Sequence, residues 1–197
     1  RPSSGGATCG TGYTLVAPLT AEWVEKAKAA KEPIDMALSD ALSIQKQEKP
    51  VFEGRCVGIL YAEGSDKAMI DEIKAGVEKD GGTVKLVAPK VGEIKVKGGT
   101  LKADGQLAGT PSVVFDAVVA ILMPDQAQEL AKDVGAVAWF ADAWYHCKTI
   151  GACGGTREHI LPKANIEPDA GVPKPEDFLK VGTKRHWDRE PKVRDLA

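Results

Sequence analysis

The sequence predicts an α/β protein with a doubly wound, mainly parallel sheet and helices on both of its faces. Two runs that are apolar throughout, at 56–61 and 115–122, are typical of strands buried on both faces. Other segments carry apolar residues every three or four positions, as amphipathic helices do. A strand, a helix and a strand within about thirty residues form the right-handed parallel crossover from which such sheets are built.

Residues 1–51 are predicted to be an extended arm and a helical linker outside the compact domain. Residues 1–18 are rich in Gly, Ser, Thr and Pro and show no apolar period. Helical spacing begins at Thr20 and stops at Pro33, and a second helix is expected over 35–47, with an apolar side formed by Leu38, Ala41 and Leu42. Because the chain starts without Met and without a signal-type apolar stretch, we interpret it as a fragment or a processed product.

The compact domain is predicted over residues 52–165. Its first strand, 56–61, leads into a helix that Ser65 or Asp66 caps, and a second strand follows at 83–87. Residues 92–109 alternate apolar and polar side chains around two turn sequences, Gly98-Gly99 and Asp104-Gly105, which predicts a small β-hairpin insertion.

The second half of the domain repeats the pattern. A central strand at 115–122 is followed by two helical stripes, within 127–134 and 137–144, and by a last strand at 149–153. Residues 166–197 are predicted to be a tail that packs on the domain or on a partner.

Composition excludes several classes of partner. The 26 Lys and Arg residues are balanced by 28 Asp and Glu residues, so no broad positive field favours nucleic acid or an anionic membrane. No apolar run approaches the roughly 20 residues of a spanning helix. The cysteines lack the short paired spacings of zinc or redox sites; they are Cys9, Cys56, Cys147 and Cys153.

Ligands of an open parallel sheet bind beyond the carboxyl ends of its strands, which here are 63–65, 123–125 and 153–156. The first of these loops, at Gly64, has neither a dinucleotide fingerprint nor a phosphate-loop Lys followed by Ser or Thr. We therefore expect no cofactor in this chain.

The apolar strand ending at Pro124 and the turn 150–155 resemble the class I glutamine amidotransferase-like superfamily, a flavodoxin-like fold. Its enzymes place a nucleophilic cysteine at the sharp turn between strand and helix, a position that falls here on Gly154. Glycine has no side chain to react, so we predict no catalytic residue and a degenerate elbow of Cys153, Gly154 and Gly155.

Two further features bear on this elbow. Cys153 lies one residue early, and successive strand side chains point to opposite faces. The supporting carboxylate of the superfamily would lie at the start of the first helix, where this chain has Lys67-Ala68-Met69. If the alignment slips by one residue, Cys153 becomes the nucleophile of a cysteine-dependent hydrolase, a glyoxalase-like enzyme or a peroxide sensor.

A closer resemblance, over the whole chain, is to the C-terminal extension of large-subunit haem catalases. It rests on the segments 33–39, 52–60, 115–119 and 184–191. The resemblance implies a flavodoxin-like domain without an active site, attached to a catalase core that decomposes hydrogen peroxide. Such a domain would pack on that core and on neighbouring subunits, stabilise the tetramer and shape the route of peroxide to the haem.

This chain itself is not expected to hold haem or metal. No arginine-spaced haem-ligand setting surrounds its tyrosines, which are Tyr13, Tyr61 and Tyr145. A metal site is likewise not expected at His146, Cys147 and Cys153, and 157–159 is interpreted as a charged, solvated helix face.

The tail contains Trp187 among basic residues, which is typical of an aromatic anchor that docks on a partner. With Arg185, and with Trp23 of the linker, it is a candidate docking residue. Faces that normally contact the catalase core would be exposed in the isolated chain, so holdase activity toward unfolded client proteins is a further hypothesis.

Overall fold

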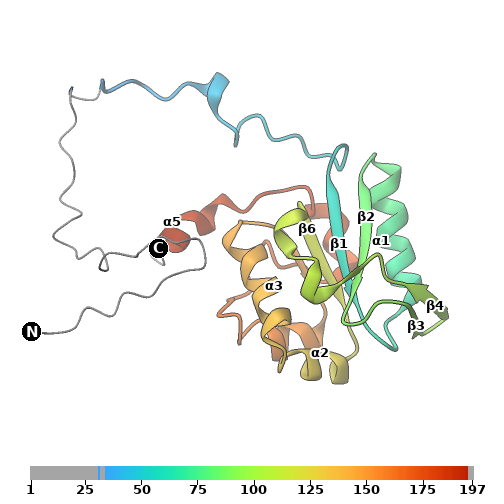
Figure 1. The fold of residues 1–197 in the computed structure, drawn as a ribbon. Coiled ribbons are helices and arrows are strands. Elements are labelled where there is room, and N and C mark those ends of the chain that lie inside the picture. The colour runs from blue at the N-terminus through green and yellow to red at the C-terminus, as the bar shows by residue number, and fades with distance from the viewer. Residues whose placement is uncertain (1–30, 32–33, 195–197) are drawn as a thin grey trace, which may run out of the picture. The chain divides into compact units, whose positions relative to one another are not determined.

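The structure, a computed structural model, describes residue 31 and residues 34–194 (Figure 1). The chain divides into two units, residues 1–40 and 41–197, and the fold below is that of the second unit. Three features of the sequence lie outside the described residues: the helix expected from Thr20, the docking candidate Trp23, and Tyr13.

A five-stranded sheet, in the order β5-β2-β1-β6-β7, forms the centre of this unit. Every pair of neighbours is parallel, and Ile59 of β1 lies between Leu86 of β2 and Val119 of β6. The predicted fold class is therefore confirmed. The strands are β1 (Cys56–Tyr61), β2 (Thr83–Ala88), β5 (Gly105–Gln106), β6 (Ala117–Ile121) and β7 (Ile150–Ala152).

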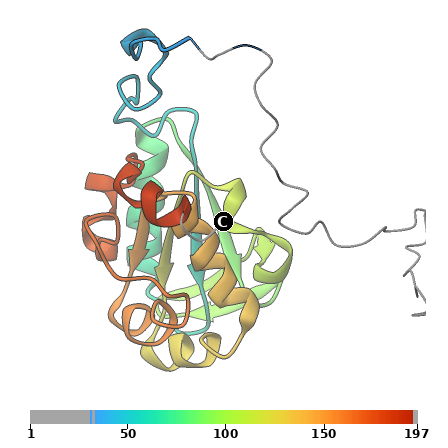
Figure 2. The ribbon, with the colours of Figure 1, turned by 90° about the vertical axis from the view of Figure 1, so that its left-hand side faces the viewer.

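Helices cover both faces of this sheet (Figure 1 and, turned by 90°, Figure 2). On one face, α1 (Lys67–Lys79) and α4 (Phe178–Val181) enclose a core with Val57, Ile59 and Tyr61 of β1. On the other, α2 (Pro124–Leu130) and α3 (Val134–Tyr145) pack on Leu60 and its neighbours. Among the described helices, none has the length and apolar character needed to cross a membrane.

Short helical turns connect these elements. Single 3₁₀ turns span Asp40–Leu42, Leu107–Gly109, Ser112–Val114, Pro175–Asp177 and Trp187–Arg189, a π-helical turn spans Thr156–Ile160, and α5 spans Glu190–Arg194.

The predicted hairpin insertion is present as β3 (Glu93–Val96) and β4 (Gly99–Lys102), an antiparallel pair. Gly98 lies in its turn and Gly99 begins β4, with φ of 100° and 143°, a region that favours glycine. At the expected second turn the chain bends at Asp104, and there Asp104 binds Leu86 rather than closing a second hairpin. Its amide donates to the Leu86 carbonyl and its carboxylate accepts from the Leu86 amide, both at 2.8 Å, which directs the chain into β5.

The helix predicted over 35–47 was wrong. Of that range only Asp40–Leu42 is helical, as a single 3₁₀ turn. A short helix in water depends on packing of its apolar side, and Leu38 and Leu42 are 99% and 83% exposed. The helical spacing of the apolar residues was therefore not sufficient to predict a helix over 35–47.

Candidate functional site

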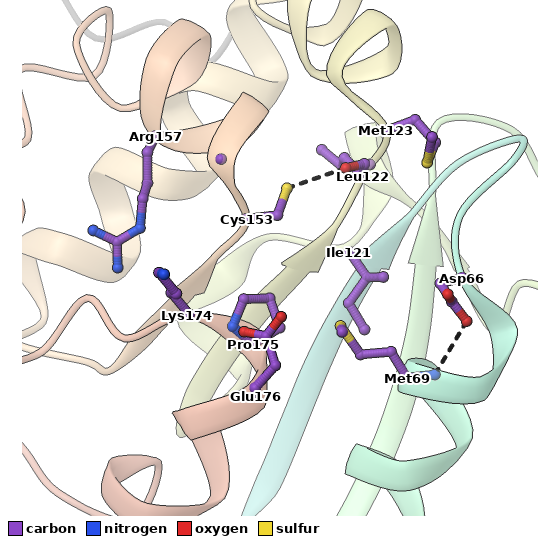
Figure 3. A pocket seen from close by; sticks show the side chains of 11 residues that line it. Asp66, Met69, Ile121, Leu122, Met123, Cys153, Arg157, Lys174, Pro175 and Glu176 are labelled. Carbon is purple, nitrogen blue, oxygen red and sulfur yellow. Dashed lines mark hydrogen bonds between the residues drawn. The ribbon is translucent and has the colours of Figure 1, made fainter.

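A pocket of about 410 Å³ lies at the carboxyl ends of the strands, where the sequence placed the ligand-binding edge (Figure 3). Met69 of the first turn of α1, Met123 after β6 and Cys153 after β7 line it, with residues 174–176 opposite. Most of this lining is apolar. The pocket thus brings together two of the three loops that the sequence analysis singled out, 123–125 and 153–156, whereas the first loop, 63–65, does not line it.

The Cys153 thiol is half-buried and has two oxygen neighbours. It donates to the Leu122 carbonyl at 3.1 Å, drawn as a dashed line in Figure 3, and lies 3.1 Å from the Thr156 hydroxyl. Both neighbours are neutral, and neither is a base that takes up a proton near neutral pH. A cysteine nucleophile is normally activated by such a base or by a neighbouring positive charge.

The turn that follows Cys153 enters its helix without strain. The described residues with positive φ do not include Cys153, Gly154 or Gly155, and Gly155 is helical, with φ of −62° and ψ of −37°. A nucleophile elbow, in contrast, holds its reactive residue on a sharp, strained turn.

The two glycines of the turn have different roles. A Cβ on Gly155 would lie 2.9 Å from the Cα of Pro124, so only glycine allows the close approach to α2. A Cβ on Gly154 would meet no atom within 4 Å. Packing therefore does not require a glycine at position 154.

No carboxylate lies in the first turn of α1, where the superfamily's supporting acid was expected. Asp66 precedes that turn as its N-cap and accepts from the amides of Ala68 and Met69 at 3.0 and 3.4 Å. The same carboxylate forms an ion pair with Lys97 at 3.8 Å. The hydrogen bonds of Asp66 thus cap the N-terminal end of α1.

Within the segment 157–159, Glu158 is exposed as expected for a solvated face, whereas Arg157 is not. Arg157 is half-buried, and its guanidinium donates to the carbonyl of Ala152, at 3.0 Å, and to that of Val172. The backbone adds two bonds here, because the amides of Ile150 and Ala152 donate to the carbonyls of Gly171 and Pro173. Arg157 therefore helps to hold residues 171–173 along the edge of β7 that faces away from β6.

The tail is anchored by Arg189, a residue that the sequence analysis did not single out. Its guanidinium is 2% exposed and donates twice to the Asp169 carboxylate, at 2.8 and 2.6 Å. It also donates to the Lys148 carbonyl at 2.7 Å and lies 3.8 Å from the centre of the Trp144 ring. Local pattern could not reveal this anchor, because its partners lie 20 or more residues before it in the sequence.

Two titratable groups respond to this anchor. Burial would raise the pKa of Asp169, but the hydrogen bonds and charge of Arg189 outweigh it and leave the pKa below its usual value. Burial, together with the charge of Arg189, lowers the pKa of His186, whose Nε2 lies 2.9 Å from the Thr149 hydroxyl.

The docking candidates Trp187 and Arg185 lie on the same tail. Both are half-buried, and both line a groove of about 500 Å³ together with Ile44, residues 47–49 and Arg55. Arg185 is also bound within the domain, because it donates to the His146 carbonyl at 2.9 Å and pairs with Asp116 at 3.4 Å.

Lys148 is a buried cation at the start of β7. Its ammonium is held by the carbonyls of Ser112 and Val113 at 2.8 and 3.0 Å, and the residue is 2% exposed. Burial, with the repulsion of Arg185, lowers the pKa of Lys148 to about 8. Among the residues that the structure describes, no group of three His, Cys, Asp or Glu side chains could hold a metal ion.

The fold is similar to that of a solved protein. A solved two-domain protein of Anabaena variabilis, containing DJ-1/ThiJ/PfpI-like and ferritin-like domains, matches with a TM-score of 0.50 and 21% identity, over 58% of this chain and 34% of that one. This likeness concerns the fold alone.

The chain belongs to the family described as the C-terminal domain found in long catalases, whose model matches residues 53–190. "Catalase C" of Rhizobium meliloti (strain 1021) is 36% identical over 170 residues, which cover 81% of this chain and 24% of that protein. "Catalase-B" of Dictyostelium discoideum is 28% identical over 149 residues, covering 71% and 21%. The chain thus spans less than a quarter of the length of these two relatives.

Proposed function

We propose that this chain is the non-catalytic C-terminal domain of a large-subunit haem catalase that decomposes hydrogen peroxide. The domain acts by contact: it packs on the catalase core and on neighbouring subunits, stabilises the tetramer and shapes the path of peroxide to the haem. The observation that carries this proposal is the Cys153 thiol, which stands at the degenerate elbow with neutral oxygens as its hydrogen-bond partners. Family membership supports the assignment to a catalase.

Haem belongs, in this proposal, to the core of the parent enzyme. Tyr61 does not fit as its ligand, because it is fully buried and its hydroxyl donates to the Leu101 carbonyl at 3.3 Å. Burial, together with the charge of Asp104, raises the pKa of Tyr61, whereas a tyrosine that ligates haem iron binds as the anion.

Truncation of the parent enzyme tests the contact role. A parent that ends at residue 52 of this numbering should lose activity at a temperature lower by about 5 °C or more, because contacts that bind only the folded state stabilise it. Its subunits should also separate at lower urea concentration, and its KM for peroxide should change. Unchanged thermal inactivation, subunit dissociation and KM would contradict the proposal.

Thiol chemistry tests the alternative in which Cys153 is a nucleophile. Iodoacetamide at neutral pH should label Cys153 slowly, and Gly154→Cys provides the matched comparison because a side chain there meets no atom within 4 Å. Rapid labelling of Cys153, with a hydrolase or glyoxalase activity that Cys153→Ser abolishes, would establish the alternative.

Holdase activity of the isolated chain is the remaining part of the proposal. Its support is a set of large apolar side chains that the compact unit leaves 45–81% exposed, including Val91, Val113, Val114 and Val134. At an equimolar ratio, the chain should suppress the thermal aggregation of a client enzyme. Aggregation at the rate seen with an inert protein would remove this part of the proposal.

A further inference from the structure

The pocket at the carboxyl edge of the sheet has the properties of a small-molecule site. Its volume of about 410 Å³ lies within the usual range for such sites, about 300–1,000 Å³. Two thioether side chains, Met69 and Met123, form part of its apolar wall, and methionine adjusts readily to the shape of an apolar partner. Met123 is 46% exposed, so an apolar ligand would remove it from water. The pocket therefore favours a ligand with an apolar body.

Arg157 brings a positive charge to this apolar pocket. Its guanidinium is held in place, because Nε and Nη2 donate to the carbonyls of Ala152 and Val172. Within the described part of the chain, Nη1 donates to no acceptor and no carboxylate pairs with Arg157. A charge that is withdrawn from water is normally paired. The Nη1 donors are therefore available to an anion that enters the pocket.

The charges that line the pocket are unevenly arranged. Figure 3 shows Arg157 and Lys174 on one side of the pocket and Asp66 on the other. The Asp66 carboxylate already caps α1 and pairs with Lys97, so its charge is compensated. The remaining carboxylate of the lining, that of Glu176, is exposed to water. One end of the pocket is therefore positive, and a carboxylate fits that end because hydrogen bonds between charged groups are stronger than those between neutral ones.

We propose that this pocket binds a small monocarboxylate with an apolar body, such as a medium-chain aliphatic acid. The carboxylate accepts hydrogen bonds from Arg157 at the positive end, and the hydrocarbon part packs on Met69 and Met123. Binding is reversible and forms no bond to Cys153, since that thiol has neutral partners and no base to activate it. The inference goes beyond the proposed function and does not depend on it, because the lining comes from this chain alone.

Probes that share one hydrocarbon chain and differ in head group test the charge of the ligand. Octanoate, octan-1-ol and octylamine are each titrated into a solution of this protein at pH 7, and binding is followed by NMR at the amides of residues 153–157. Octanoate should bind about tenfold or more tightly than octylamine, with octan-1-ol between them, because only the carboxylate forms a charge-assisted hydrogen bond with Arg157. Equal affinities, or no shift of these amides with octanoate, would overturn the inference.

A substitution that fills the pocket tests where the probe binds. Gly154→Leu adds a side chain to the lining, and its Cβ would meet no atom within 4 Å, so the fold has room for it. This variant should weaken octanoate binding about tenfold, because the leucine occupies part of the pocket. Gly109→Leu is the matched control, since its Cβ would also meet no atom within 4 Å and residue 109 does not line the pocket. An equal loss of affinity in both variants, or an unchanged or higher affinity of Gly154→Leu, would overturn the inference.

Charge reversal at Lys174 tests the positive end of the pocket. Lys174 is exposed, so Lys174→Glu should leave the fold intact. The variant should weaken octanoate binding about threefold or more and leave octan-1-ol binding unchanged, because only octanoate carries a charge. Equal effects on the two probes would overturn the placement of the carboxylate beside Arg157 and Lys174, and the inference with it.

Discussion

Removal of the Arg189 guanidinium should strongly destabilise the fold. Arg189→Ala deletes a doubly hydrogen-bonded ion pair to Asp169, a bond to the Lys148 carbonyl and the contact with the Trp144 ring. Breaking a buried pair by removing one partner costs about 3–5 kcal/mol, and a desolvated contact between a cation and a ring contributes about 1 kcal/mol.

The expected loss lies at the lower end of that range. The Asp169 side chain is 39% exposed, so water can solvate its carboxylate once Arg189 is gone. We therefore expect a decrease of about 3 kcal/mol in the free energy of unfolding. With a urea slope of about 2 kcal/mol per molar, the unfolding midpoint should fall by about 1.5 M.

Urea titration followed by circular dichroism measures this shift. Lys180→Ala is the matched control, since it removes an ion pair with Asp177 whose side chains are 75% and 53% exposed, and its midpoint should not shift measurably. The urea midpoint of Arg189→Lys should lie between those of the two alanine variants, because lysine keeps the charge and loses the bidentate hydrogen bonding. The same midpoint for Arg189→Ala and Lys180→Ala would refute the assignment of Arg189 as the anchor of the tail.

Two further predictions concern packing and pH. Gly171→Ala should destabilise the fold by about 2 kcal/mol, since its Cβ would lie 2.1 Å from Nη2 of Arg189 and 2.4 Å from Cδ2 of His186. Gly154→Ala is the control and should leave the urea midpoint almost unchanged. Equal urea midpoints for the two variants would contradict this reasoning. For Lys148, whose folded pKa of about 8 lies below its usual 10.5, the unfolded state binds more protons between these values, so stability rises with pH. From pH 8 to pH 10 the wild type should gain about 2 kcal/mol relative to Lys148→Met, measured by urea unfolding at both pH values, and no relative gain would contradict the lowered pKa.

The central sheet was predictable because its signals are local. The strand 56–61 and the helix capped by Asp66 are each encoded in a few consecutive residues, and both occur at those positions. The same argument explains the failure over 35–47, where Leu38 and Leu42 have helical spacing but no surface to pack on. Spacing predicts which side of a helix would be apolar, and burial decides whether the helix forms.

The site was predictable in position and less so in detail. Parallel strands bring their carboxyl ends to one edge, so Cys153 and Met123 share a pocket as expected. The anchor at Arg189 depends on Asp169, Trp144 and Lys148, each of which lies 20 or more residues before it in the sequence. Interactions of this kind require coordinates.

The empty space beside Gly154 has an evolutionary consequence. Since the backbone there is ordinary and no neighbour would obstruct a side chain, a single mutation could place a thiol or hydroxyl at the apex at little cost in stability. The packing of the neighbouring residues thus does not account for the missing side chain at this position. The scaffold remains open to gaining chemistry again, in nature or by engineering.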